Sequence, residues 1–368
     1  MKVAILTSSR ADYGIYKPLL NKLCNDPFFS CEIIVFGTHL SKIHGNTINK
    51  IIADGFTPFA TLETAPESDS PEAIVKSMGK TMSLFAEFWK KYAGDFDFVF
   101  CLGDRYEMLA AVMSGVPFNI PFAHIHGGEE TLGAIDNVFR HSITLAAELH
   151  FVSHESYKNR VTEIMHDSKN IYCTGALSLD NLNELTLFSK EEFYKHFKIS
   201  FDKPAVLVTY HPETINYQDN IIHTQELIKA LEILSEKYRL IITMPNADTM
   251  GNYIREQIQV FSKKRKDVFM IENFGTKGYF SCMQYVDFIL GNSSSGIIEA
   301  ASFGKYVINI GDRQKGRIAS ENVLNCTNNS SEILKVSDSI PGRPFPGISN
   351  IYGNGTAALK IIDILKNK

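Results

Sequence analysis

Residues 286–300 read VDFILGNSSSGIIEA, and this stretch joins a strand to a helix through a turn of small polar residues. Its first five residues are mostly apolar and include aromatic and β-branched side chains, which favour a strand covered on both faces. A flexible serine linker is the alternative interpretation, but linkers are not normally placed between a strand and an amphipathic helix. The junction therefore predicts one βα unit of a parallel α/β sheet.

The same alternation of apolar runs and amphipathic segments continues through the rest of the chain. We expect strands at 2–7, 31–37, 96–103, 121–126, 149–153 and 170–175, and again at 205–210, 239–244, 267–272, 286–292 and 306–311. This order predicts an α/β fold of two doubly wound, Rossmann-like domains with an active-site cleft between them. We place the domains at 1–180 and 181–353, and a C-terminal docking helix at 354–368.

The composition excludes several classes of protein. The 368-residue chain is 44% hydrophobic and 21% charged, and its net charge of -4 gives no general attraction to nucleic acid. Its six cysteines are scattered without a C-x-x-C pair, and no apolar run is long enough for a signal peptide or a membrane span. We therefore predict a cytoplasmic protein without nucleic-acid or membrane partners, and the apolar helical surface of the first domain predicts a homodimer or homotetramer.

Ligands of doubly wound sheets bind beyond the carboxyl ends of the strands, so the polar residues that follow each strand are the candidates for a site. The first strand is followed by TSSRADYG, which lacks the G-x-G-x-x-G pattern of a dinucleotide site and argues against NAD or FAD. Arg10 and Asp12 could instead bind substrate. The alternative is that Asp12 caps the following helix while Arg10 is solvated, and the sequence favours neither interpretation.

The stretch HIHGGEETLGAIDNVFRH, residues 124–141, concentrates ionisable side chains after another predicted strand. It holds His126, Glu129 and Asp136, together with Arg140 as a candidate substrate-binding residue, and Asp104 follows the strand before it. Carboxylates and a histidine gathered at one edge are what general acid–base catalysis requires, because one group removes a proton while another delivers one. An ion pair between Asp136 and Arg140, four residues apart on a helix, is the structural alternative.

A metal site is the other interpretation of the same stretch. His124 and His126 alternate along one strand, but the sequence offers no third ligand at a recognised spacing. We therefore predict neither a metal nor an organic cofactor.

The second half places a different chemistry after its strands. His211 could protonate or bind a leaving phosphate, and Asn246 could act as a polar clamp, although a turn is an equal alternative for it. Gly296 would let the backbone approach a ligand, and Ser293, Ser294 and Ser295 would add hydroxyl donors at a helix start. Glu299 could accept hydrogen bonds from a ribose diol, and Arg313 could neutralise phosphates. Together these residues predict a site for a nucleoside diphosphate.

These motifs resemble those of the hydrolysing UDP-N-acetylglucosamine 2-epimerases of sialic-acid-type sugar pathways. The resemblance covers nearly the whole chain and rests on RADYG, GDR, HIHGGE with AID and RH, HPET, GNSS-G-x-x-E, and DRQKGR with EN, in the family's order. It implies a GT-B-like fold and a reaction without NAD or catalytic metal. UDP-N-acetylglucosamine would lose its C2 proton and UDP to give 2-acetamidoglucal, and water would then add to give N-acetylmannosamine.

The resemblance also implies roles for individual residues. Asp104 and Asp136 match acid–base carboxylates, and His211 matches a histidine at the leaving group. The remaining matches are to the nucleotide site, through Arg10, Arg313, Ser293, Ser294 and Glu299. One position departs from the family, because many relatives have a catalytic glutamate where this chain has His126; either His126 or the nearby Glu129 takes that role.

The substrate remains open between two sugars, since some family members act on UDP-N,N'-diacetylbacillosamine in the legionaminic acid pathway. A GT-B glycosyltransferase, a non-hydrolysing epimerase and an inactive nucleotide-sugar sensor are the rival interpretations. The carboxylates around the sugar argue against a transferase, and GDR with HIHGGE fits the hydrolysing subgroup better than the non-hydrolysing one. The intact Asp104, Asp136 and His211 argue against an inactive sensor.

Overall fold

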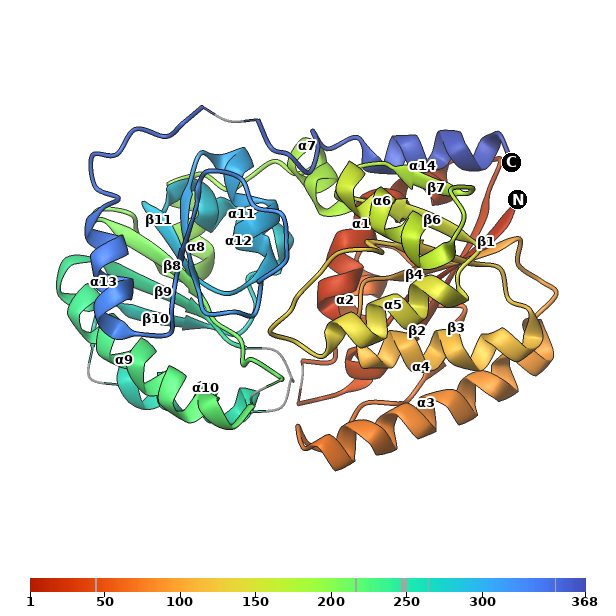
Figure 1. Cartoon of the computed structure of the whole chain (residues 1–368), viewed down its shortest axis with the longest axis horizontal. Helices are drawn as coiled ribbons and strands as arrows, with labels where there is room; N and C mark the ends of the chain where they lie inside the picture. Colours follow the sequence, from red (N-terminus) through yellow and green to blue (C-terminus); the bar gives the residue numbers. More distant parts are fainter. Residues whose placement is uncertain (44, 216, 246–249, 264, 348) are drawn as a thin grey trace. The chain divides into compact units, whose positions relative to one another are not determined.

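The computed structural model describes the 368-residue chain except positions 44, 216, 246–249, 264 and 348. The chain forms two compact units, each with its own parallel sheet (Figure 1). Unit 1 comprises Met1–Glu129, Asp136–Glu184 and Tyr352–Lys368, and unit 2 comprises Glu130–Ile135 and Leu185–Ile351. The predicted α/β class with two doubly wound sheets is confirmed.

Unit 1 contains a seven-stranded sheet in the order β3-β2-β1-β4-β5-β6-β7, and every pairing in it is parallel. Its strands are β1 (Lys2–Thr7), β2 (Ser30–Phe36), β3 (Ala60–Leu62), β4 (Phe98–Leu102), β5 (Phe122–Ile125), β6 (Leu149–Val152) and β7 (Ile171–Cys173). Its helices are α1 (Arg10–Asn25), η1 (Gly37–Leu40), α2 (Ile48–Ala53), α3 (Pro71–Tyr92), α4 (Tyr106–Gly115), η2 (Val116–Phe118), α5 (Asp136–Ala146), α6 (Glu155–Met165), η3 (Leu177–Leu179), α7 (Asp180–Glu184) and α14 (Ala357–Lys366). The strand order reverses between β1 and β4, which is where such sheets bind ligands.

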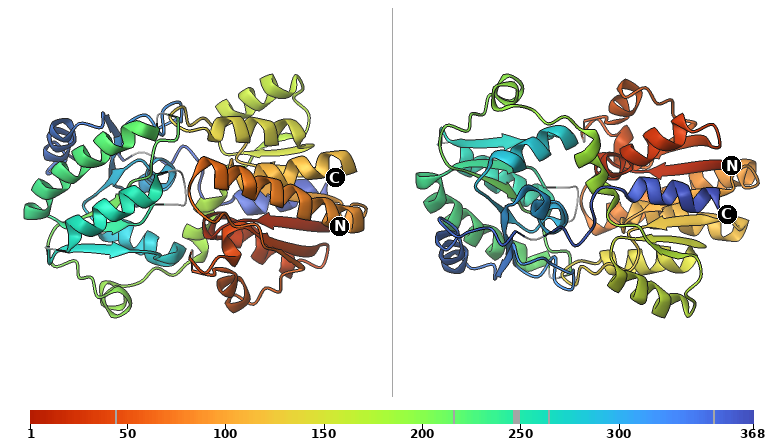
Figure 2. Two further views of the ribbon diagram at one scale, coloured as in Figure 1. Left: turned by 90° about the horizontal axis from the view of Figure 1, so that it is seen from below. Right: turned by 90° about the horizontal axis from the view of Figure 1, so that it is seen from above.

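The interior strand β1 of unit 1 is buried on both faces, as its continuous apolar sequence requires. Val3 and Ile5 pack in one core with residues of α1 and α14, whereas Ala4 and Leu6 pack in the other with residues of α3 and α4. Helices accordingly cover both faces of the sheet, as the two views of Figure 2 show. The sheet is therefore a rigid support for the loops at its carboxyl edge.

The C-terminal helix α14 packs on unit 1 although it follows the whole of unit 2 in the sequence (Figure 2, right). Its apolar face, which includes Ile361 and Leu365, is buried in the core that contains α1. Its first turn is fixed by Asp180, whose two carboxylate oxygens accept hydrogen bonds from the backbone nitrogens of Ala357 (2.9 Å) and Ala358 (2.7 Å). A carboxylate at a helix start satisfies otherwise unpaired N–H groups there.

Unit 2 contains a six-stranded parallel sheet in the order β10-β9-β8-β11-β12-β13. Its strands are β8 (Ala205–Thr209), β9 (Arg239–Thr243), β10 (Val268–Ile271), β11 (Phe288–Gly291), β12 (Tyr306–Ile310) and β13 (Val323–Cys326). Its helices are α8 (Lys190–Phe197), η4 (Tyr217–Asp219), α9 (Asn220–Lys237), α10 (Gly251–Ser262), α11 (Gly275–Tyr285), α12 (Ser294–Ile298), η5 (Ala300–Phe303) and α13 (Ser330–Asp338). The order reverses between β8 and β11, so the turns after these strands form the candidate binding edge of unit 2.

The edge strands β3 and β13 were not expected from the sequence. Among the described residues, no helix combines the length and the apolar character that crossing a membrane would require.

Candidate functional site

The turn after β1 is organised by the buried carboxylate of Asp12. Its oxygens accept hydrogen bonds from the backbone nitrogens of Ser8 (2.7 Å) and Ser9 (2.9 Å) and from the hydroxyl of Thr7 (2.9 Å). Burial would raise the pKa of Asp12, but the neighbouring His39 and these backbone donors lower it overall. Asp12 thus holds the turn in the manner of a capping residue, and Arg10, the first residue of α1, is half-buried beside it.

The turn after β4 carries Asp104, which forms an ion pair with Arg140 of α5. The Arg140 side chain is almost completely buried, and its Nη1 also donates to the Glu129 carbonyl oxygen at 2.6 Å. A buried guanidinium requires such partners, since leaving its charge uncompensated would be strongly destabilising. Arg140 therefore ties Asp104 to the loop after β5, and Asp136 lies one turn away at the start of α5.

The loop after β5 brings His126 and Glu129 together. His126 Nδ1 lies 2.6 Å from Glu129 Oε1, and the Ser153 hydroxyl donates to the same oxygen at 2.6 Å. The Glu129 side chain is 2% exposed and that of His126 is 9% exposed, so the pair is shielded from solvent. His126 Nε2 is also buried, and it has no hydrogen-bond partner among the described residues.

Two neighbouring histidines of the same sheet are held neutral. His124 Nε2 lies 2.8 Å from the Gly103 carbonyl oxygen, next to Asp104, and its Nδ1 lies 3.2 Å from the Thr144 hydroxyl. Burial lowers the pKa of His124 to about 3 and the pKa of His150, on the adjacent strand, to about 4. The part of the chain that the structure describes contains no group of three His, Cys, Asp or Glu side chains arranged to hold a metal ion.

In unit 2, the turn after β11 is fixed by a residue that the sequence did not single out. Asn292 is fully buried; its Oδ1 accepts from the His211 backbone nitrogen at 2.7 Å, and its Nδ2 donates to the His211 carbonyl at 2.8 Å. The Asn292 carbonyl in turn accepts from Gln314 (2.9 Å) and from Arg313 Nη1 (3.4 Å). Asn292 therefore joins the turns after β8, β11 and β12.

The glycines of this turn are required by the packing of unit 2. A Cβ atom at Gly291, whose φ is +139°, would lie 1.9 Å from the Thr209 carbonyl oxygen. A Cβ atom at Gly296 would lie 2.9 Å from a methyl group of Val307. Packing within unit 2 thus accounts for both glycines, and the predicted approach of the Gly296 backbone to a ligand stays a prediction.

The serines after β11 have different environments. Ser293 caps α12, and its hydroxyl lies 3.0 Å from the hydroxyl of Ser295. The Ser295 hydroxyl also bonds Tyr279 at 2.7 Å, and Tyr279 reaches Thr209 at 3.2 Å. The Ser294 side chain is half-buried and makes no hydrogen bond to another described residue. Within the described part of the chain, Ser293 and Ser295 thus use their hydroxyls in hydrogen bonds to other residues, whereas Ser294 does not.

Helix α12 is short and ends at Ile298, so Glu299 is its C-cap. Glu299 is 5% exposed. Burial, together with the nearby Glu299 charge, raises the pKa of Tyr279 to about 12, although the hydrogen bonds to Ser295 and Thr209 act in the opposite direction. Tyr279 is therefore a neutral hydroxyl group between the serine turn and Glu299.

The turns after β8 and β12 are linked by a second carboxylate, Glu213. Its Oε1 accepts from the Asp312 backbone nitrogen at 3.0 Å and from Asn328 at 3.1 Å. Burial raises the pKa of Tyr210, Glu213 raises it further, and the positive charge of Arg313 lowers it. Arg313 thus belongs to an ordered polar group, of which the sequence predicted only Arg313 and His211.

The segment Glu130–Ile135 belongs to unit 2, although the residues on both sides of it belong to unit 1. The Leu132 backbone nitrogen donates to the Lys315 carbonyl at 2.8 Å, and the Thr214 nitrogen donates to the Gly133 carbonyl at 3.3 Å. A Cβ atom at Gly133 would lie 2.5 Å from the Asp312 carbonyl oxygen, so only glycine fits there. Glu129 and Asp136 therefore flank a segment that rests on the turns after β8 and β12.

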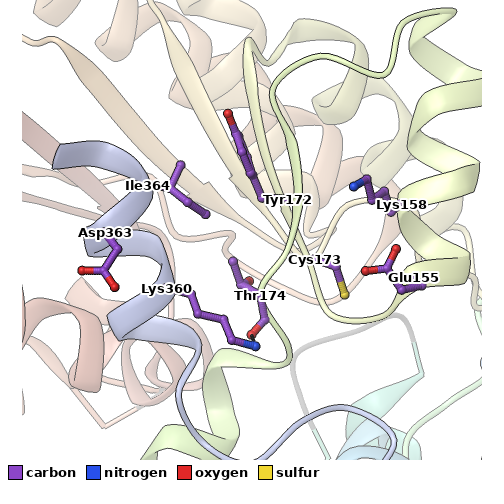
Figure 3. A pocket seen from close by; sticks show the side chains of 8 residues that line it. All are labelled: Glu155, Lys158, Tyr172, Cys173, Thr174, Lys360, Asp363 and Ile364. Carbon is purple, nitrogen blue, oxygen red and sulfur yellow. Dashed lines mark hydrogen bonds between the residues drawn. The ribbon is translucent and has the colours of Figure 1, made fainter. Parts of the chain in front are cut away.

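Unit 1 also contains a hollow of about 360 Å³ between α6, β7 and α14 (Figure 3). Lys158 and Lys360 line it together with Glu155 and Asp363, so its charges balance, and none of the predicted site residues lies in it. Burial and the Glu155 carboxylate raise the pKa of Cys173, in the same hollow, to about 11. This thiol is therefore not a thiolate at neutral pH.

The structure groups the predicted residues within each unit. Asp104, His126, Glu129 and Arg140 are connected by hydrogen bonds or ion pairs in unit 1, and His211 and Arg313 are connected through Asn292 in unit 2. Asn246 lies outside the described residues.

Comparisons with known proteins support the predicted family over nearly the whole chain. The family model for UDP-N-acetylglucosamine 2-epimerase matches residues 21–366. The chain is 33% identical over 365 residues to the UDP-N,N'-diacetylbacillosamine 2-epimerase (hydrolyzing) of Legionella pneumophila, covering 99% of this chain and 95% of the relative. It is 35% identical over 324 residues to the GDP/UDP-N,N'-diacetylbacillosamine 2-epimerase (hydrolyzing) of Campylobacter jejuni, covering 88% and 83%.

A solved structure shares the fold. The UDP-GlcNAc 2-epimerase of Neisseria meningitidis, bound to UDP-GlcNAc, aligns over 100% of both chains with a TM-score of 0.85 and 18% identity. This likeness confirms the predicted GT-B-like fold. On the family model and the two relatives together, the chain belongs to the UDP-N-acetylglucosamine 2-epimerase family.

Proposed function

We propose that this protein is a hydrolysing 2-epimerase of a UDP-activated 2-acetamido sugar. The observation that supports it most directly is the connected set of Asp104, Arg140, Glu129 and His126 in a chain of this family. Two relatives that align over 99% and 88% of this chain are themselves named as hydrolysing 2-epimerases.

The reaction requires both the removal of a proton and the stabilisation of a negatively charged leaving group. The C2 hydrogen of an acetamido sugar is only weakly acidic, so its removal requires a positioned base. The departing UDP carries growing negative charge, which requires positioned donors or cations. We assign the first task to residues of unit 1 and the second to residues of unit 2.

In unit 1, Asp104 and Asp136 are the proposed acid–base carboxylates, with His126 and Glu129 beside them. Arg140 is proposed to fix Asp104 rather than to touch the sugar, because both of its terminal nitrogens are used within the unit. Arg10, at the start of α1, remains the proposed diphosphate contact of this unit.

In unit 2, Arg313 and His211 are proposed to bind the diphosphate, because Asn292 holds both in fixed turns. Ser294 is proposed to donate to the nucleotide, while Ser293 and Ser295 shape the turn. Glu299 is proposed to accept from the ribose diol. These elimination steps give 2-acetamidoglucal and UDP, and addition of water then gives the free 2-epimeric sugar.

Two sugars are candidates for the substrate. UDP-N-acetylglucosamine is the sugar implied by the family's name, whereas the names of the Legionella and Campylobacter relatives favour UDP-N,N'-diacetylbacillosamine. The second sugar differs at C4 and C6, so the two can be separated by direct comparison of rates.

The test is to incubate the protein with each UDP-sugar in heavy water and follow both products. We expect release of UDP and a free sugar inverted at C2 and carrying deuterium there. The assay should work in a strong chelator without added nicotinamide cofactor. Retention of the original C2 hydrogen would indicate hydrolysis or glycosyl transfer and reject the proposal, and absence of UDP release with both sugars would favour a nucleotide-sugar sensor.

The predicted oligomeric state and the predicted cytoplasmic location stay predictions. Light scattering in solution and cell fractionation would test them.

A further inference from the structure

The loop that joins His126 to Glu129 has an unusual backbone. His126 has φ +67°, a left-handed conformation that non-glycine residues seldom adopt, and Gly128 follows with φ +75°. A Cβ atom at Gly128 would lie 2.6 Å from the Tyr157 carbonyl oxygen, so the turn is enclosed. Strained residues of this kind persist where the surrounding structure fixes them, and they cluster at functional sites.

This turn folds the Glu129 carboxylate back onto the imidazole of His126. A carboxylate has no hydrogen to donate, so the 2.6 Å contact requires the hydrogen to be on His126 Nδ1. Ser153 donates to the same oxygen and holds the carboxylate in place. In a neutral imidazole with Nδ1–H, the lone pair is on Nε2, which is the nitrogen without a hydrogen-bond partner among the described residues.

We infer that His126 is the catalytic base that removes the C2 proton, and that Glu129 and Ser153 are positioning residues acting through it. The inference rests on the proposed function and decides which residue replaces the family's glutamate. Glu129 is less suited to touch the sugar itself, because its Oε1 already accepts two short hydrogen bonds in a buried site.

The C2–H bond breaks and its proton moves to His126 Nε2, the C2 electron pair forms the C1–C2 double bond, and the C1–O bond breaks to release UDP. Glu129 stabilises the imidazolium through the existing Nδ1 hydrogen bond. Inversion at C2 requires the new proton to arrive on the opposite face, so a second group, Asp104 or Asp136, must deliver it during hydration.

The experiment compares His126→Gln and His126→Ala with His150→Gln, a matched change at a buried histidine on the neighbouring strand. We expect both His126 variants to lose roughly 10²- to 10⁴-fold in turnover, with UDP affinity unchanged and with partial recovery for His126→Ala in added imidazole. His150→Gln should retain turnover. A His126→Gln protein as active as the wild type would overturn the inference.

A second readout separates positioning from direct catalysis by Glu129. Nitrogen-15 NMR of histidine-labelled protein should show His126 with hydrogen on Nδ1, assigned by the signal missing from His126→Gln. Glu129→Gln should lower turnover less than His126→Gln does, and it should reduce the fraction of His126 that carries hydrogen on Nδ1. Ser153→Ala should change both turnover and this fraction in the same direction, but by less. If Glu129→Gln abolishes turnover while leaving the tautomer unchanged, Glu129 is itself the base.

These outcomes are judged only after the wild type has released UDP and placed deuterium at C2. Failure of the wild type in that assay would reject the proposed function. Success of the wild type together with an active His126→Gln variant would reject only the inference about His126.

Discussion

The carboxyl edges of the two sheets have the same architecture but carry different kinds of side chain. At the edge of unit 1, ionisable groups are paired with one another, as Asp104 with the buried Arg140 and the buried Glu129 with His126. At the edge of unit 2, the turn after β11 is held mainly by neutral groups, namely the amide of Asn292 and the hydroxyls of Ser295 and Tyr279. Both sheets reverse their strand order at these positions.

This difference in side-chain chemistry indicates which unit can take part in proton transfer. Carboxylates and imidazoles in a shielded site can exchange a proton with a substrate, because each of them has a protonated and a deprotonated form. Fixed hydroxyls and amides keep their hydrogens at neutral pH and can only donate or accept hydrogen bonds. Substitutions in unit 1 should therefore affect turnover, whereas substitutions in unit 2 should affect the affinity for UDP.

The largest effect is expected from removing a carboxylate of unit 1. Asp104→Asn and Asp136→Asn should each lower turnover by roughly 10²- to 10⁴-fold, the usual scale for a positioned acid or base. UDP affinity, measured by calorimetry, should stay nearly constant. Asp95→Asn, the same change at an exposed aspartate of unit 1, is the matched control.

Asp104→Asn also removes the partner of a buried arginine, so its thermal unfolding must be measured alongside turnover. Equal losses of turnover and UDP affinity in either variant would contradict the assignment of proton transfer to unit 1 and of UDP binding to unit 2.

The next largest effect is expected at Glu299 of unit 2. A hydrogen bond to a charged acceptor contributes about 1.5–3 kcal/mol, so Glu299→Ala should weaken UDP binding roughly 10- to 100-fold. Calorimetry with UDP measures this loss, and circular dichroism confirms that the variant is folded. Glu299→Gln, which keeps the shape and one acceptor, should lose less. Unchanged UDP affinity in Glu299→Ala would show that the ribose assignment is wrong.

A third prediction concerns the stability of unit 1 in acid. Burial lowers the pKa of His124 to about 3 and of His150 to about 4, whereas an unfolded histidine titrates near 6.5. As the pH falls below 6.5, the unfolded chain binds protons that the folded chain does not, so the free energy of unfolding decreases. At pH 5 each histidine should cost about 2 kcal/mol of stability.

The measurement can use the one tryptophan of the sequence, Trp89, which is buried in unit 1. Urea unfolding followed by its fluorescence at pH 7 and pH 5 should show a smaller pH difference for His150→Gln, by roughly 2 kcal/mol. An identical pH dependence in the variant and the wild type would mean that His150 is not held neutral in the folded state.

Sequence patterns were sufficient for the sheets and for most of the polar clusters, because continuous apolar strands and the residues after them follow simple periodic rules. The strands β3 and β13 were missed because they are edge strands of only three and four residues, too short to show a periodic pattern. Their existence depends on the neighbouring strand that they pair with, and no local pattern reports that pairing.

The details of the site depended on tertiary contacts that local patterns do not encode. Asn292 follows a strand and looks like an ordinary turn residue, yet its amide joins three turns of unit 2. Glu130–Ile135 is contiguous with the acid–base motif in sequence but belongs to unit 2. The pairing of His126 with Glu129 likewise depends on a turn with left-handed residues. The adjacent glycines permit such a turn, but their presence in the sequence does not show that it forms.

The smallest predicted effect separates the serines of unit 2. Ser295 uses its hydroxyl within the protein, at 2.7 Å from Tyr279 and 3.0 Å from Ser293, whereas Ser294 makes no hydrogen bond to another described residue. Ser294→Ala should therefore remove one hydrogen bond to UDP and no bond within the protein. The expected loss is about 0.5–1.5 kcal/mol, or roughly 2- to 13-fold in UDP affinity by calorimetry, with unchanged thermal stability. Ser295→Ala, the matched control, should instead lower the melting temperature, since it leaves the buried Tyr279 hydroxyl with one partner fewer. If Ser295→Ala weakens UDP binding at unchanged stability while Ser294→Ala does not, the roles of the two serines are reversed and Ser295 turns toward the nucleotide when it binds.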